Sequence, residues 1–125
     1  MKKPTVAKLK KKADKVFSEY IRQKYADDNG FVYCFTCGTR KHWKQMQNSH
    51  YVSRSFNSLR YSEENCHPAC AACNIWKHGN LDEYALRLQE KYGAGILKKL
   101  AKEKRKIKQF TVEELQTLIK YYSSQ

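Results

Sequence analysis

Four of the five cysteines form two C-x-x-C pairs, Cys34/Cys37 and Cys70/Cys73. A C-x-x-C turn directs two thiolates toward one point, so two such turns supply the four soft ligands of a tetrahedral zinc site. The gap between the pairs is longer than the ~15–20 residues usual in such sites, which indicates an insertion. A redox-active pair is the alternative, but it needs no second, matching pair. The sequence therefore predicts structural zinc on these four thiolates, with Cys66 left over as a small buried residue.

The insertion and the residues just after it contain side chains that could hydrolyse a phosphodiester bond. His50 follows a short extended segment, a loop leads to Asn65, and Asn74 comes directly after the second cysteine pair. A neutral imidazole can take a proton from water near pH 7, and an amide oxygen suits magnesium or manganese. Taken alone, His50 is more often a histidine that caps a strand. The order of the three residues favours catalysis instead.

Two segments of the chain resemble a known family. They are Asn48-Ser49-His50-Tyr51 and residues 65–77. They resemble the HNH nucleases in their four-cysteine form. The core of those enzymes is a ββα-metal finger: a hairpin with the histidine, a loop with the middle asparagine, and a helix with the last metal ligand. The stretch 34–84 is similar to the NinG (Rap) recombination-nuclease family of phage lambda, whose members are implicated in cutting branched recombination intermediates. The resemblance implies a metal-dependent DNA endonuclease acting on Holliday junctions or D-loops.

The resemblance also implies a role for each matching residue. His50 corresponds to the general base, and Asn65 to the asparagine that holds the base in place. Asn74 corresponds to a ligand of one Mg2+ or Mn2+ ion, which stabilises charge on the phosphate and on the leaving 3′ oxygen. Lys77, about one helical turn further on, would face the phosphate as a positive charge. This interpretation requires His50 and Asn74 to face the same phosphate.

The sequence departs from the family pattern immediately before the base. Many HNH enzymes have aspartate or histidine there as a second metal ligand, whereas this chain has Ser49. His67 or His78 could complete the ligand set, together with water and DNA phosphate. His67 lies near the zinc cysteines and is more simply a structural histidine. His78, before a glycine, could equally cap the end of a short helix.

The charge of the chain indicates a polyanionic partner. Its 25 Lys and Arg residues exceed its 12 Asp and Glu residues, a net charge of +13. Residues 1–25 carry net +7 and residues 98–108 net +6, so the remainder is neutral. Basic helix faces are often merely solvated, but with this excess we expect DNA contact. The candidate DNA-binding residues are Arg54 and Arg60 in the loop after the base, Lys77, and the flanking Lys8, Lys11, Lys12, Lys15, Lys104 and Arg105.

The elements that must position these residues follow from local patterns. At 125 residues and 14.8 kDa the chain has the length of one domain, 1–125. Apolar residues at helical spacing predict an N-terminal basic helix over 5–27, and further helices in 81–125 include one that a capping box at Thr111 begins. The zinc and HNH core occupies 31–80. The predicted fold class is α+β, a small zinc-stapled ββα-metal (HNH) finger flanked by basic helices.

The sequence argues against a membrane or secreted protein and leaves two alternatives to a DNA endonuclease. No apolar run approaches the ~18–20 residues of a membrane span, and lysines follow Met1 in place of a secretory signal. We therefore expect a cytoplasmic protein with no membrane partner, in the host cytoplasm if it is phage-encoded. The terminal helix could form a homodimer or close the core of the monomer. The main rival is a non-catalytic zinc-finger protein that binds nucleic acid, and a second is a nuclease that acts on RNA.

Overall fold

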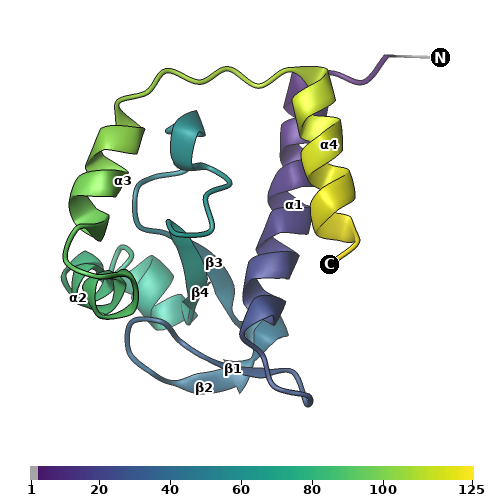
Figure 1. Ribbon diagram of the computed structural model, residues 1–125. Coiled ribbons are helices and arrows are strands. Elements are labelled where there is room, and N and C mark those ends of the chain that lie inside the picture. Colours follow the sequence, from purple (N-terminus) through teal and green to yellow (C-terminus); the bar gives the residue numbers. More distant parts are fainter. Residues whose placement is uncertain (1–2) are drawn as a thin grey trace.

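The computed structural model describes residues 3–125, in which two antiparallel hairpins lie between two pairs of helices: the first and last helices of the chain on one side and the two middle helices on the other (Figure 1). The elements in chain order are α1 (Val6–Lys24), β1 (Phe31–Tyr33), β2 (Arg40–His42), β3 (Gln47–His50), β4 (Cys66–Ala69), α2 (Leu81–Tyr92), α3 (Ile96–Lys104) and α4 (Val112–Ser123). Short 3-10 turns cover Trp43–Gln45 and Asn57–Leu59, and a π-helical turn covers Ala72–Trp76. The mixed helix and small-sheet class is as predicted.

Helix α1 is bounded by local chemistry at both ends. The Thr5 hydroxyl accepts the backbone N–H of Lys8 and so caps the first turn. The helix ends at Lys24, three residues before the predicted limit of 27. Its buried face, with Phe17 and Ile21, packs on the β3–β4 hairpin and on Cys66. The helix thereby forms one wall beside the strand that carries His50.

The β3–β4 hairpin sets the register of the central region. His50, the last residue of β3, lies opposite Cys66, and the chain between them forms a loop over 51–65. The local sequence pattern predicted neither β2 nor β4. In β4 the pattern is weakened by Pro68, which has no N–H to donate to a neighbouring strand. All four residues of β4 are buried, and the carbonyl of Pro68 accepts the N–H of Phe35 near the first hairpin. Tertiary packing therefore makes this segment a strand.

The element after β4 differs from the helix expected of a ββα-metal finger. The chain forms a five-residue π-helical turn, Ala72–Trp76, and then three consecutive residues with positive φ, His78, Gly79 and Asn80. Their left-handed backbone ends the turn, and the N–H of Gly79 bonds the carbonyl of Cys73. Asn74 therefore lies on a short turn fixed at both ends, and the ββα fold as predicted is not confirmed.

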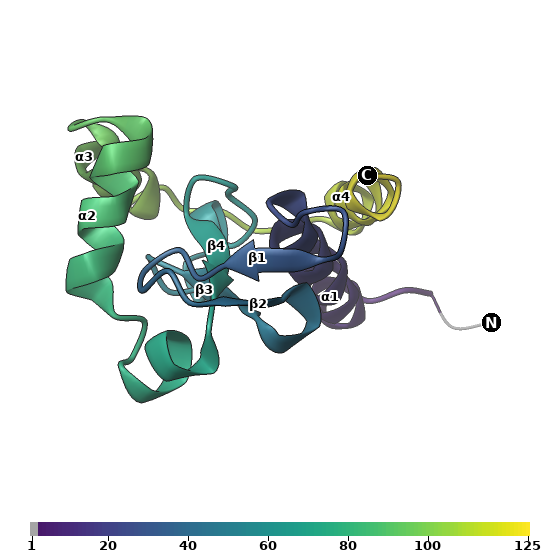
Figure 2. The same cartoon turned by 90° about the horizontal axis from the view of Figure 1, so that it is seen from below.

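The C-terminal helices cover two different sides of the hairpins (Figures 1 and 2). Helices α2 and α3 enclose one apolar cluster around Tyr84 and Leu88, whereas α4 packs along α1 with Leu115 buried against Ala13. The predicted capping box at Thr111 is present. The apolar face of α4 is thus used within the chain. Among the described residues, no helix is long and apolar enough to cross a membrane.

Candidate metal centre and adjoining cleft

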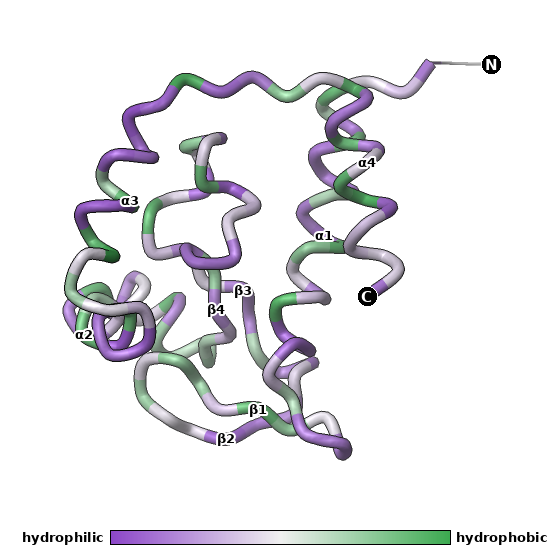
Figure 3. The backbone as a smooth tube through the Cα atoms, viewed as in Figure 1, coloured by the Kyte–Doolittle hydropathy of each residue, from purple (hydrophilic) through white to green (hydrophobic). Residues whose placement is uncertain are grey.

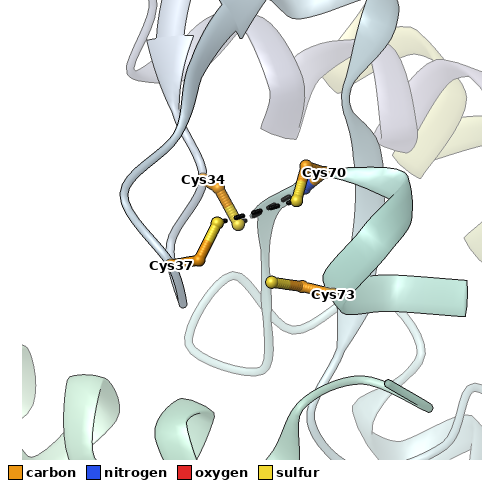
Figure 4. Close-up of side chains that lie close together, drawn as sticks. All are labelled: Cys34, Cys37, Cys70 and Cys73. Carbon is orange, nitrogen blue, oxygen red and sulfur yellow. Dashed lines mark hydrogen bonds between the residues drawn. The ribbon is translucent and has the colours of Figure 1, made fainter. Parts of the chain in front are cut away.

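The four predicted cysteines meet at one point (Figure 4). Their Sγ atoms all lie within 4.8 Å of one another, and those of Cys37 and Cys70 are 3.7 Å apart. A zinc ion at ~2.3 Å from each of four thiolates separates the sulfurs by about 3.8 Å, so the spacing fits a tetrahedral zinc site. The cluster could therefore bind zinc, as predicted.

Hydrogen bonds around the first cysteine pair lower the pKa of Cys34 and Cys37 and so favour their thiolates, whereas burial raises the pKa of Cys70. Cys34 lies just after β1 and receives the N–H of Cys70, while the side-chain amide of Asn80 donates to Cys73. Burial raises the pKa of the Cys34 thiol, but hydrogen bonds from the backbone and from Thr36 outweigh burial and lower this pKa to about 6. The cysteines join the first hairpin to the turn after β4. A bound metal would therefore fix the position of the turn that carries Asn74.

A cleft of about 370 Å³ adjoins this turn and brings His50 and Asn74 together. The two side chains come from different elements, one from the end of β3 and the other from the π-helical turn. Both line the same space, as a shared phosphate would require. The full lining is Asp14, Phe17, Ser18, Asn48, His50, Ser53, Arg54, Arg60, Tyr61 and Asn74.

The imidazole of His50 is held in one tautomer. Its Nε2 atom lies 2.9 Å from the carbonyl oxygen of Arg60. A carbonyl can only accept, so Nε2 carries the proton and Nδ1 is left as the basic nitrogen. Burial lowers the pKa of His50, the hydrogen bond to Arg60 opposes this, and the charges of Arg54 and Arg60 lower it further. The histidine therefore stays neutral near pH 7, the form that can accept a proton.

Asn65 lies outside the cleft and acts on the loop rather than on the imidazole. It is fully buried, and its side-chain oxygen accepts the N–H of Val52 at 2.8 Å. Its amide nitrogen donates to the carbonyls of Val52 and Leu59 at 2.9 and 3.3 Å. The side chain therefore ties together the two ends of the loop, which also carries the carbonyl that bonds His50. Asn65 is thus a positioning residue.

Neither of the further histidines offered as metal ligands lies in the cleft. His67 is fully buried, with Nδ1 2.9 Å from the Tyr84 hydroxyl and Nε2 2.8 Å from the Tyr92 hydroxyl. Both ring nitrogens are therefore occupied, and burial lowers the pKa of His67 to about 3. His67 as a ligand is thus wrong. His78 and Lys77 are exposed on the chain beyond the turn and do not line the cleft.

Arg60 is held by an acidic partner from α1. Its guanidinium pairs with both carboxylate oxygens of Asp14, which also accepts the hydroxyl of Tyr61. Burial raises the pKa of Asp14, but the bonds from Arg60 and Tyr61 outweigh it and lower this pKa. Arg60 therefore joins the loop to α1 and keeps little capacity to grip DNA. Arg54 lies on the same cleft and is exposed, as a DNA contact requires.

The two basic segments of the sequence converge beside the loop that lines the cleft. Lys10 of α1 donates to the side chain of Asn57, whose amide donates to the carbonyl of Lys108. The ammonium group of Lys104 lies 4.6 Å from the ring centroid of Phe56 in the same loop. The mostly hydrophilic connection from α3 to α4 crosses above this loop (Figure 3). The predicted DNA-binding lysines Lys8, Lys11, Lys12 and Lys15, with Lys104 and Arg105, are exposed.

Among the lining residues to which sequence reasoning gave no role, Asn48 and Asp14 bear most on the chemistry of the cleft. Asn48 is two positions before His50, and alternation along a strand places both side chains on one face. That alternation was readable from the sequence once the strand was assigned. The side-chain oxygen of Asn48 is buried without a hydrogen-bond partner in the part of the chain that the structure describes. Asp14, on α1, was not detectable, because only packing brings that helix to the loop.

The fold and the site together define a small protein of mixed helices and strands, with a cluster of four cysteines that could bind a metal ion and a polar cleft next to the turn after that cluster. The family profile of the bacteriophage lambda NinG protein matches residues 2–125. The ninG proteins of Salmonella phage P22 and Escherichia phage 933W are each 29% identical over 119 residues, which cover 89% of this chain and 58% of theirs. The ninG protein of Escherichia phage lambda is 33% identical over 94 residues, or 69% of this chain and 46% of its own.

The chain therefore belongs to the NinG family of phage proteins. It spans about half the length of these relatives. No solved structure matches it significantly.

Proposed function

We propose that this protein is a metal-dependent DNA endonuclease of the HNH type. The observation that carries the proposal is the shared cleft, which His50 and Asn74 both line, while the bond from Nε2 of His50 to the carbonyl of Arg60 leaves Nδ1 as the basic nitrogen. The chain order of His50, Asn65 and Asn74, on a strand, at the end of a loop and on the turn after the second strand, also supports it, since an HNH site has its histidine and two asparagines in that order.

The residues of the cleft would divide the work of hydrolysis. His50 takes a proton from the attacking water through Nδ1, while the carbonyl of Arg60 keeps the ring oriented. Arg54, on the rim, attracts the phosphate. Asn74 would supply an oxygen to Mg2+ or Mn2+. When bound, the ion would stabilise negative charge on the phosphate and on the leaving oxygen.

The basic segments support nucleic acid as the substrate. Residues 1–25 carry net +7 and residues 98–108 net +6. Lys10 of the first segment and Lys108 of the second both contact Asn57, in the loop that forms one side of the cleft. Phosphate contacts would therefore surround the scissile bond on two sides. We place the action of the enzyme on branched recombination intermediates in the host cytoplasm, as the family resemblance implies. A junction substrate would suit a homodimer with two opposed sites.

The test is an endonuclease assay on a four-way junction, a D-loop, duplex DNA, single-stranded DNA and RNA, with Mg2+ or Mn2+. We expect the wild type to cut DNA and His50→Ala to lose cleavage by a factor of about 100 or more while still binding DNA. His78→Asn is the matched control, since asparagine tolerates the positive φ at this position and the cleft is untouched.

Three outcomes would contradict the proposal. Equal DNA binding by both proteins with no cleavage under any condition would favour a non-catalytic zinc protein. Retained cutting by His50→Ala would remove His50 as the base. Cleavage of RNA alone would keep the site and change the substrate. Circular dichroism and zinc content of each variant show that it is folded.

A further inference from the structure

The side-chain oxygen of Asn48, a residue that lines the cleft, is buried and has no hydrogen-bond partner among the described residues. Leaving a buried acceptor unpaired costs about 1–3 kcal/mol, so such an atom in a folded protein needs an explanation. A neutral oxygen in the wall of a polar cleft, on the same strand as a candidate catalytic histidine, is of the type that binds a hard cation.

The geometry of β3 explains why this oxygen comes from position 48. Asn48 and His50 both line the cleft, because residues two apart on a strand share a face. Ser49 is fully buried and absent from the lining. The position immediately before the base, where the resemblance expects a second ligand, therefore faces the interior. The residue one place earlier presents the oxygen instead.

Asn74 also has a side-chain oxygen that accepts no hydrogen bond from the described residues. Its amide nitrogen donates to the side-chain oxygen of Gln47 at 2.7 Å, while its Oδ1 accepts no hydrogen bond within 3–125. In the same way His50 has committed Nε2 to the carbonyl of Arg60 and keeps Nδ1. Two amide oxygens from different elements thus remain beside the base. The nearest carboxylate in the lining, Asp14, is already bonded to Arg60 and Tyr61.

We propose that Asn48 and Asn74 together bind the catalytic divalent cation, an inference that rests on the proposed nuclease function. Both ligands are neutral, so the protein alone holds the ion weakly, and the DNA phosphate supplies the negative charge that completes the site. Cation binding and substrate binding therefore strengthen each other.

The test measures Mn2+ binding by electron paramagnetic resonance on the zinc-loaded protein without DNA. Asn48→Asp adds a charged ligand to the site, and we expect Mn2+ to bind at least about tenfold more tightly than to the wild type. Asn48→Ala should bind about tenfold more weakly, or below detection. Gln116→Glu is the matched control, because it adds the same charge on the exposed face of α4 and should leave Mn2+ affinity unchanged.

The inference would be overturned if Asn48→Asp bound Mn2+ no more tightly than the wild type does. It would also be overturned if Gln116→Glu increased Mn2+ affinity as much as Asn48→Asp. Cleavage assays of the same proteins separate this failure from failure of the proposed function. If the wild type cuts DNA while neither Asn48 variant changes Mn2+ binding, the site is wrong and the nuclease stands. If Asn48→Asp binds Mn2+ tightly but no protein cuts any nucleic acid, the site stands and the nuclease is wrong.

Discussion

The side chain of Asn65 should be the largest single polar contribution to the stability of the loop over 51–65. Replacing it with alanine removes three hydrogen bonds, two to Val52 and one to Leu59, from a fully buried position. At about 1 kcal/mol each, Asn65→Ala should lower the free energy of unfolding by about 3 kcal/mol. Asn65→Asp should be at least as destabilising, since its carboxylate would face two carbonyl oxygens.

Urea unfolding of the zinc-loaded proteins, followed by circular dichroism, measures this effect. With a denaturant slope of about 2 kcal/mol per molar, the midpoint of Asn65→Ala should fall by about 1.5 M. Asn29→Ala, in an exposed turn, is the matched control and should change stability by less than about 0.5 kcal/mol. A midpoint for Asn65→Ala within error of the wild type would refute the assignment of this amide as the tie across the loop.

Two further predictions concern the metal centre and the base. Cys70→Ser should lose stoichiometric zinc and unfold the central region, because structural zinc contributes about 10–16 kcal/mol, comparable to the stability of a whole domain. Cys66→Ala lies outside the cluster and should keep one zinc per chain by atomic absorption; full zinc in Cys70→Ser would contradict the four-thiolate site. Because the pKa of His50 is lowered, the acid limb of kcat/KM for cleavage should lie below pH 6.5, with activity lost as pH falls through it. Arg54→Ala should move the acid limb of the kcat/KM profile to higher pH, and Lys120→Ala should not. If the acid limb of Arg54→Ala lies at the same pH as that of the wild type, the charge of Arg54 does not act on His50.

The features that the sequence alone determined are those that depend on short-range spacing. The two C-x-x-C pairs predicted which four cysteines form the cluster that could bind zinc, because a single turn of chain brings the two thiols of each pair together. The helical period placed α1 to within three residues, and the capping box placed the start of α4 at Thr111. Net charge indicated a polyanionic partner without locating the surface that would bind it.

Only the tertiary structure decided which polar residues share the cleft. The order of His50, Asn65 and Asn74 along the chain gave no sign that Asn65 bonds the backbone while Asn74 lines the cleft together with His50. The reason is that the direction of each side chain depends on packing between distant segments. Asp14 reaches the loop because α1 packs on β3 and β4, and Asn48 faces the cleft because the pairing of β3 with buried β4 fixes which face each residue takes.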